Sequence, residues 1–211
     1  MSLRDGAVVL GGARTAMGRL QGSLSSLSAA DLGGFAIAGA LERSGVQPTD
    51  IDYVVLGQVL QAGSGQNAAR QAAIAGGLGM AIPALTINKV CLSGIDAIAL
   101  ADQMIRAGEF DAVVAGGMES MSQAPHLLIG SREGKKYGDW TMIDALAFDG
   151  LTCAFDECAM GEATERYNDR YALTRQEQDA VAEASHRRAA AAQSVGILAE
   201  EITPVRIPQR K

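Results

Sequence analysis

Short apolar runs alternate with amphipathic segments along the first 118 residues of the chain. Apolar runs bounded by Gly, Pro or Asp predict buried strands, and segments with apolar residues every three to four positions predict helices. The predicted strands cover 7–10, 53–60, a stretch that begins at 84, and 111–115, and the predicted helices cover 28–45, 67–78 and 93–107. Strands and helices in alternation predict an α/β sheet with helical layers.

Polar residues mark where three of the predicted helices begin. In each case a Ser or Thr precedes an acidic residue by three positions, so that the two residues can cap the helix reciprocally. The pairs are Ser28 with Asp31, Ser93 with Asp96, and Thr174 with Glu177. Gly45 and Gly108 follow the ends of two of the helices, as expected of residues that stop a helix.

The pattern changes after about residue 118, where loop-type sequence gives way to polar helices. A charged run at 132–136 is expected to be a solvated loop, with contact to a phosphate-bearing ligand or another subunit as the alternative. The elements predicted in this part are a loop-rich region over 119–150, helices over 161–171 and 174–196, and an edge strand over 201–208.

The composition is that of a globular protein, with 48% hydrophobic and 20% charged residues. A net charge of −6 argues against binding to nucleic acid, which requires clustered Lys and Arg. No apolar run approaches the ~20 residues that a membrane span needs, and the N-terminus has no signal-peptide pattern. The three cysteines lack zinc-type spacing, so no metal site is predicted and a reducing cytoplasm is favoured.

Cys91 is the strongest chemical candidate in the sequence. It lies where the predicted strand that begins at 84 turns into the helix over 93–107. The start of a helix carries unpaired N–H groups and a partial positive charge, which favour a thiolate by roughly 0.3 to 2 kcal/mol. The thiolate is the nucleophilic form of cysteine. A free cysteine is also a common buried hydrophobic residue, and position alone leaves this alternative open.

Other motifs give weaker predictions. The loop at 63–68 follows a strand and opens a helix, as in the dinucleotide fingerprint G-x-G-x-x-A. The acidic residue that the fingerprint needs about 20 positions later is missing from 80–90. A tight turn is therefore preferred, and a nucleotide-dependent oxidoreductase is the alternative. His126 and His186 are the available bases for Cys91, and both lie in polar sequence typical of solvated residues.

Several motifs together resemble the N-terminal half of the thiolases, the acetyl-CoA C-acetyltransferase family. The most specific are Cys-x-Ser-Gly at 91–94 and Gly-Gly-Met-Glu-Ser-Met at 116–121. Further matching stretches are 14–16, 57–63, 65–67, 69–72, 88–90, 124–126, 160–161 and 174–185. The resemblance covers nearly the whole chain. It implies one half of a five-layered αβαβα fold with a mixed sheet, as an N-terminal domain at 1–118 and an incomplete helical loop domain at 119–211.

The resemblance implies that Cys91 carries an acyl group as a thioester, with its own N–H in an oxyanion hole. One acetyl-CoA would acylate Cys91, and the enolate of a second acetyl-CoA would attack the acyl group to give acetoacetyl-CoA. The reverse reaction would be thiolysis of acetoacetyl-CoA. Leu151 and Met160 match positions beside the coenzyme A pantetheine in relatives. Coenzyme A thioesters are then substrates, and no tightly bound cofactor is expected. Homodimers or homotetramers are the assemblies that the family implies.

The sequence departs from the family in two respects. Relatives with a biosynthetic role often carry His where Ala159 stands, which leaves the acyl chain length open. Thiolases also have a second, similar half that supplies a catalytic His and a second catalytic Cys, and its motifs are not in this sequence. We therefore expect the isolated chain to be inactive. A non-catalytic truncated product, or a subunit that pairs with a separate C-terminal half, is the alternative.

Overall fold

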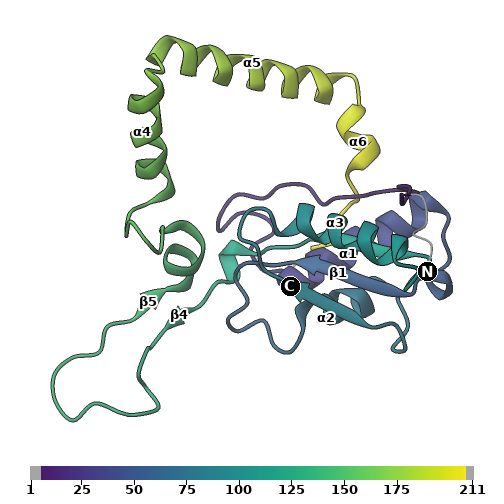
Figure 1. Ribbon diagram of the computed structural model, residues 1–211, viewed down its shortest axis with the longest axis horizontal. Helices are drawn as coiled ribbons and strands as arrows, with labels where there is room; N and C mark the ends of the chain where they lie inside the picture. Colours follow the sequence, from purple (N-terminus) through teal and green to yellow (C-terminus); the bar gives the residue numbers. More distant parts are fainter. Residues whose placement is uncertain (1–5, 208–211) are drawn as a thin grey trace.

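The computed structural model describes residues 6–207 and contains a parallel sheet (Figure 1). Its strands are β1 (Tyr53–Gly57), β2 (Ala84–Ile87) and β3 (Val113–Gly117), in the order β2-β1-β3. β1 pairs in parallel with both of its neighbours, and the predicted α/β class is confirmed. β1 ends earlier than predicted because the N–H groups of Val59 and Leu60 donate to a carboxylate instead of a neighbouring strand.

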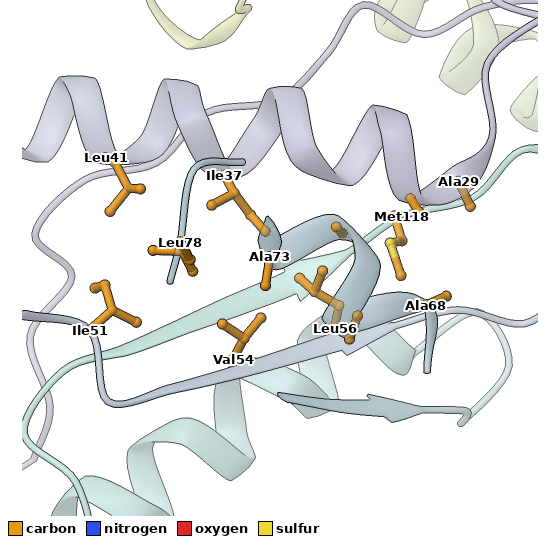
Figure 2. Close-up of a cluster of buried hydrophobic side chains, with 13 residues drawn as sticks. Ala29, Ile37, Leu41, Ile51, Val54, Leu56, Ala68, Ala73, Leu78 and Met118 are labelled. Carbon is orange, nitrogen blue, oxygen red and sulfur yellow. The ribbon is translucent and has the colours of Figure 1, made fainter. Parts of the chain in front are cut away.

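Helices cover both faces of this sheet (Figure 2). α1 (Ala29–Ser44) and α2 (Ala68–Ala75) lie on one face, where α2 contacts β1 and β2. α3 (Ser93–Arg106) lies on the other face against β1 and β3. A short 3-10 helix, η1 (Pro48–Asp50), leads from α1 toward β1. The predicted helices over 28–45, 67–78 and 93–107 are therefore confirmed, with small differences at their ends.

The hydrophobic core lies between β1 and the helices α1 and α2 (Figure 2). Successive residues of a strand point to opposite faces of a sheet. Val54 and Leu56 point toward α1 and α2, whereas Val55 is completely buried on the face that α3 covers. Ile37 and Leu41 of α1 point down onto this strand. The apolar run of β1 is thus buried on both faces of the sheet, as expected of a central parallel strand.

The predicted capping pairs of two helices are confirmed. Asp31 donates its N–H to Ser28 Oγ at 3.1 Å, and its carboxylate accepts the Ser28 N–H at 3.0 Å. The same box joins Thr174 and Glu177, where hydrogen bonds from Thr174 lower the pKa of the Glu177 carboxyl. The prediction that Ser93 caps its helix is wrong, because its hydroxyl bonds back to the preceding turn.

The strand predicted at 7–10 is not formed. Val8, Val9 and Leu10 are 78%, 87% and 64% exposed, and the described segment is extended without strand pairing. An apolar run predicts burial, but burial needs a second layer to cover the side chains. No such layer is present in the described part of the chain, so these apolar side chains stay exposed.

After β3 the chain leaves the sheet and forms an arm that curves away and returns (Figure 1). The elements are the 3-10 helix η2 (Met121–Gln123), β4 (His126–Leu127), β5 (Ile143–Asp144), the π-helix η3 (Leu146–Leu151), α4 (Met160–Tyr171), α5 (Arg175–Ser194) and α6 (Ile197–Glu201). β4 and β5 pair antiparallel within the predicted loop region. The predicted polar helices over 161–171 and 174–196 are confirmed, and none of their residues is buried.

The arm returns to the body through Arg14. The Arg14 guanidinium pairs with the Glu201 carboxylate at 2.7 Å, and the Arg14 backbone forms an isolated parallel bridge with Ile202. The edge strand predicted over 201–208 is thus reduced to one bridge. Glu201 still belongs to α6, and Pro208 lies outside the described residues.

The accessible surface of the chain is large, 14627 Å². A compact monomer of this length exposes about 9,300 Å². Part of the excess belongs to the arm, and part to apolar side chains of the body such as Val9 and Ile95. The body therefore has apolar faces that the described residues leave uncovered.

Candidate active site

Cys91 lies between β2 and α3, at the carboxyl ends of the parallel strands. Ser93 begins α3 and is buried against β1, so close that a Cβ on Gly57 would lie 2.5 Å from Ser93 Cβ. A Cβ on Gly117 would lie 3.4 Å from Gly94 Cα. The absence of these side chains lets the helix start at the sheet edge where α/β proteins bind ligands.

The turn before Cys91 is strained and held by hydrogen bonds. Val90 has a φ of 51°, a left-handed conformation that β-branched residues rarely adopt. Its N–H donates to Asn88 Oδ1 at 2.9 Å, and its carbonyl accepts the Ser93 hydroxyl at 2.6 Å. Ser93 Oγ also accepts the Lys89 N–H at 2.8 Å. These hydrogen bonds hold the turn in its strained conformation. Strained residues at functional sites persist only when the surrounding structure fixes them in this way.

Glu119 connects the ends of the strands next to this turn. Its Oε2 accepts the N–H groups of Val59 at 2.9 Å and Leu60 at 3.3 Å. The Val59 carbonyl in turn accepts Asn88 Nδ2 at 3.3 Å. Glu119 Oε1 is buried and has no hydrogen-bond partner among the described residues. The sequence alone assigned no role to Glu119. Its position as an acidic residue directly after an apolar strand is the feature that could have indicated one.

Cys91 is exposed, and its neighbours Val90, Leu92 and Ile95 are 52%, 53% and 67% exposed. Two small cavities of about 110 and 160 Å³ lie elsewhere on the body, and Cys91 lines neither of them. The alternative that Cys91 is a buried packing residue is therefore wrong for this chain. The site is an accessible thiol at a helix start, on an open and largely apolar surface.

Leu151 and Met160, predicted to bind coenzyme A, lie on the arm. Leu151 ends η3 and Met160 begins α4, and they are 44% and 42% exposed. A backbone bridge between Thr152 and Ala159 places them on opposite sides of one tight turn. No hydrogen bond within residues 6–207 joins this turn to the turn of Cys91. The coenzyme A role of both residues stays a prediction.

The structure brings neither histidine into hydrogen-bond contact with Cys91. His126 begins the short strand β4, and His186 lies in the middle of α5. Both side chains are exposed. A general base has to reach the proton that it removes, directly or through one water. Within the described residues, the accessible Cys91 thiol therefore has no histidine in hydrogen-bond contact.

The glycine loop at 63–68 has the geometry of a tight turn. Gly63 and Gly65 adopt positive φ values of 76° and 80°. The side chain of Asn67 then caps α2 by accepting the Arg70 N–H at 3.3 Å. A phosphate at this helix start would have to compete with that cap. The geometry favours the turn over the dinucleotide site.

Residues 7–211 match the family model described as "Thiolase, N-terminal domain". This chain belongs to the thiolase family. It is 59% identical over 205 residues to a "Probable acetyl-CoA acetyltransferase" of Mycobacterium leprae, covering 97% of this chain and 52% of the relative. A protein of Mycobacterium tuberculosis with the same name is 59% identical over 204 residues, with the same shares covered.

More distant thiolase relatives carry a similar name. The "Acetyl-CoA acetyltransferase" of Allochromatium vinosum is 48% identical over 209 residues, which cover 99% of this chain and 53% of that protein. The chain thus spans about half the length of the curated relatives that it matches. None of the described helices combines the length and apolarity that crossing a membrane requires.

Proposed function

We propose that this chain supplies the nucleophile of a thiolase-type acyl transfer between coenzyme A thioesters. The observation that carries the proposal is Cys91, exposed at the start of α3 within a thiolase N-terminal domain. Relatives named acetyl-CoA acetyltransferase support acetyl-CoA as the substrate. We expect the reaction to take place in the cytoplasm, where free cysteines stay reduced.

In the proposed reaction the Cys91 thiolate attacks the thioester carbonyl carbon of acetyl-CoA. The N–H of Cys91 helps to stabilise the oxyanion, and the carbon–sulfur bond to coenzyme A then breaks. Coenzyme A leaves as the thiolate and takes up a proton, so that Cys91 carries the acetyl group. The enolate of a second acetyl-CoA attacks this group, forms acetoacetyl-CoA and releases the Cys91 thiolate. Thiolysis follows the same chemical steps in the reverse order.

Other residues of the chain have supporting roles in this proposal. Asn88 and Glu119 are positioning residues, because they hold the turn and the adjacent strand ends without reaching the sulfur. Leu151 and Met160 would provide apolar contact to the pantetheine arm. Coenzyme A thioesters act as substrates, and no tightly bound cofactor is part of the scheme.

The acid and base groups are proposed to come from the C-terminal half of a thiolase sequence. The chain spans about half the length of its relatives, and its body presents an uncovered apolar face. Ile95 and Ile98 lie on the side of α3 opposite the residues that pack on the sheet, and both are exposed. A second half that covers this face would also enclose Cys91 and exclude water from the thioester.

The proposal is tested by reconstitution. The purified chain is assayed for thiolysis of acetoacetyl-CoA alone and after refolding with the C-terminal half of the Mycobacterium tuberculosis relative. We expect no turnover alone and clear turnover for the mixture. The Cys91→Ser variant should abolish the turnover of the mixture, whereas Cys153→Ser should retain it.

Two outcomes would contradict the proposal. Equal turnover by the Cys91→Ser mixture would exclude Cys91 as the acyl carrier. Turnover by the chain alone at the rate of a complete relative would show that the base lies within these residues, and His126 would be the first to replace. Formation of a radiolabelled acetyl adduct on Cys91, stable to denaturation, gives an independent readout of the first step.

A further inference from the structure

Cys153 and Cys158 face each other across a tight turn of the arm. Thr152 and Ala159 form an antiparallel bridge, so the residues next inside the turn are Cys153 and Cys158. The Cys153 N–H donates to the Cys158 carbonyl at 2.8 Å, in line with this register, while the Cys153 carbonyl accepts the Glu157 N–H at 2.9 Å. Both are free thiols.

This backbone geometry is suitable for a disulfide. Directly opposite residues of an antiparallel pair have Cα atoms about 4.5 to 5.5 Å apart, and their side chains lie on the same face. Disulfides span Cα separations of about 4.4 to 6.8 Å. Cys153 Sγ accepts the Asp156 N–H at 3.4 Å, a weak hydrogen bond that rotation about the side chain can release.

The two sulfurs have different surroundings, which suits sequential oxidation. Cys153 is half-buried and open to a small oxidant, whereas Cys158 is only 7% exposed.

We propose that Cys153 and Cys158 form a reversible intramolecular disulfide, a modification site distinct from Cys91. Hydrogen peroxide transfers one oxygen to Cys153, giving a sulfenic acid and water. The Cys158 thiolate then attacks the Cys153 sulfur, the S–S bond forms, and the S–O bond breaks to release a second water after protonation. A thiol reductant reverses the change. The disulfide closes the turn whose two ends are Leu151 and Met160.

The test is peptide mapping by mass spectrometry after limited oxidation of the folded full chain with hydrogen peroxide. Remaining thiols are blocked in acid before digestion, so that no thiol–disulfide exchange occurs during digestion. We expect a peptide pair linked through Cys153 and Cys158, in the wild type and in the Cys91→Ser variant alike. Dithiothreitol should remove the link.

A matched control moves one sulfur by a single residue. In the double variant Cys158→Ser, Ala159→Cys, the second sulfur points to the other face of the turn. In a redox titration with glutathione disulfide, the native pair should oxidise with an equilibrium constant at least about tenfold larger, or ~30 mV. Equal constants would show that chain proximity alone drives pairing. Pairing of either thiol with Cys91, or peroxide products confined to Cys153, would also overturn the proposal.

Discussion

At the scale of single residues, the candidate site depends on one missing side chain. Gly57 ends β1, and a Cβ there would lie 2.5 Å from the Cβ and 2.6 Å from the carbonyl carbon of Ser93. Backbone carbon cannot move aside as the end of a flexible side chain can. The position of Ser93, and with it the turn of Cys91, therefore requires glycine at this point.

We predict that Gly57→Ala destabilises the chain by about 1–3 kcal/mol, because the added methyl overpacks the start of α3. Urea unfolding measures this change. Iodoacetamide labelling of Cys91 in the folded variant should change in rate, since α3 has to shift away from β1. Gly79→Ala is the control, because nothing lies within 4 Å of its added Cβ. A similar loss of stability in both variants would contradict the steric explanation.

At the scale of elements, α1 and α5 have the same capping motif but contribute differently to the stability of the fold. α1 buries seven of its residues against the body, whereas α5 buries none. Most helical stability in proteins comes from packing of an apolar face rather than from local propensity. The cap of α1 is therefore coupled to the core, and that of α5 acts only on the helix itself.

We predict that Ser28→Ala lowers the free energy of unfolding by about 1 kcal/mol, the usual cost of removing a capping side chain. Thr174→Ala removes the matching cap of α5 and should leave the global unfolding transition unchanged. Hydrogen exchange should instead show faster opening at the start of α5. Equal effects on the unfolding midpoint would show that α5 belongs to the same cooperative unit as the sheet.

Asp52 ties the start of β1 to β3 and makes this junction sensitive to acid. Its carboxylate accepts the N–H groups of Ala112 at 3.0 Å and Asp111 at 2.8 Å, which lower its pKa below the ordinary 3.8. Because the folded-state pKa is the lower one, the stabilisation is present above pH 3.8 and is lost as the pH falls through the folded value.

We predict that Asp52→Asn is less stable than the wild type at neutral pH and that the difference narrows as the pH falls below about 4. The asparagine oxygen can accept the same N–H groups but carries no charge. Urea unfolding at a series of pH values measures both proteins under identical conditions. A stability difference that is independent of pH would contradict the assignment to the carboxylate.

At the scale of the whole molecule, the chain exposes far more surface than a compact monomer. Its 14627 Å² compares with about 9,300 Å² for a globular protein of this length. The buried residues of α3 are Ser93, Ala97 and Ala101, and its other side carries exposed isoleucines. In the proposed function this side packs against the C-terminal half. In its absence the same surface favours self-association.

We predict that Ile95→Lys reduces self-association of the isolated chain without lowering its stability, because the side chain is 67% exposed. Sedimentation velocity measures the oligomer fraction. Val181→Lys is the control, since Val181 is 71% exposed on α5, away from the apolar face of the body. Equal effects of the two substitutions would indicate a general charge effect. No effect of either would exclude α3 from the contact.

Local signals predicted most of the elements correctly. The caps of α1 and α5, the glycine that ends α1 and the strand around Val54 follow from short-range pattern, because each depends on residues close in sequence. Errors arose where the local pattern does not show which partner a residue takes. Ser93 bonds to the turn before it, and the segment at 7–10 lacks a covering layer. The β4–β5 pair is too short to have a periodic signal.

The sequence by itself determined the α/β class, the place of Cys91 at a strand-to-helix turn, and the resemblance to thiolases, because these reside in local pattern and motif. Only the tertiary structure decided that Cys91 is exposed, that Glu119 holds the neighbouring strand end, and that Cys153 faces Cys158. Such facts depend on which backbone groups meet across a fold. Hydrophobic periodicity does not show which residues come into contact when they are far apart in sequence. It also does not fix the register of a turn, which can shift by one position.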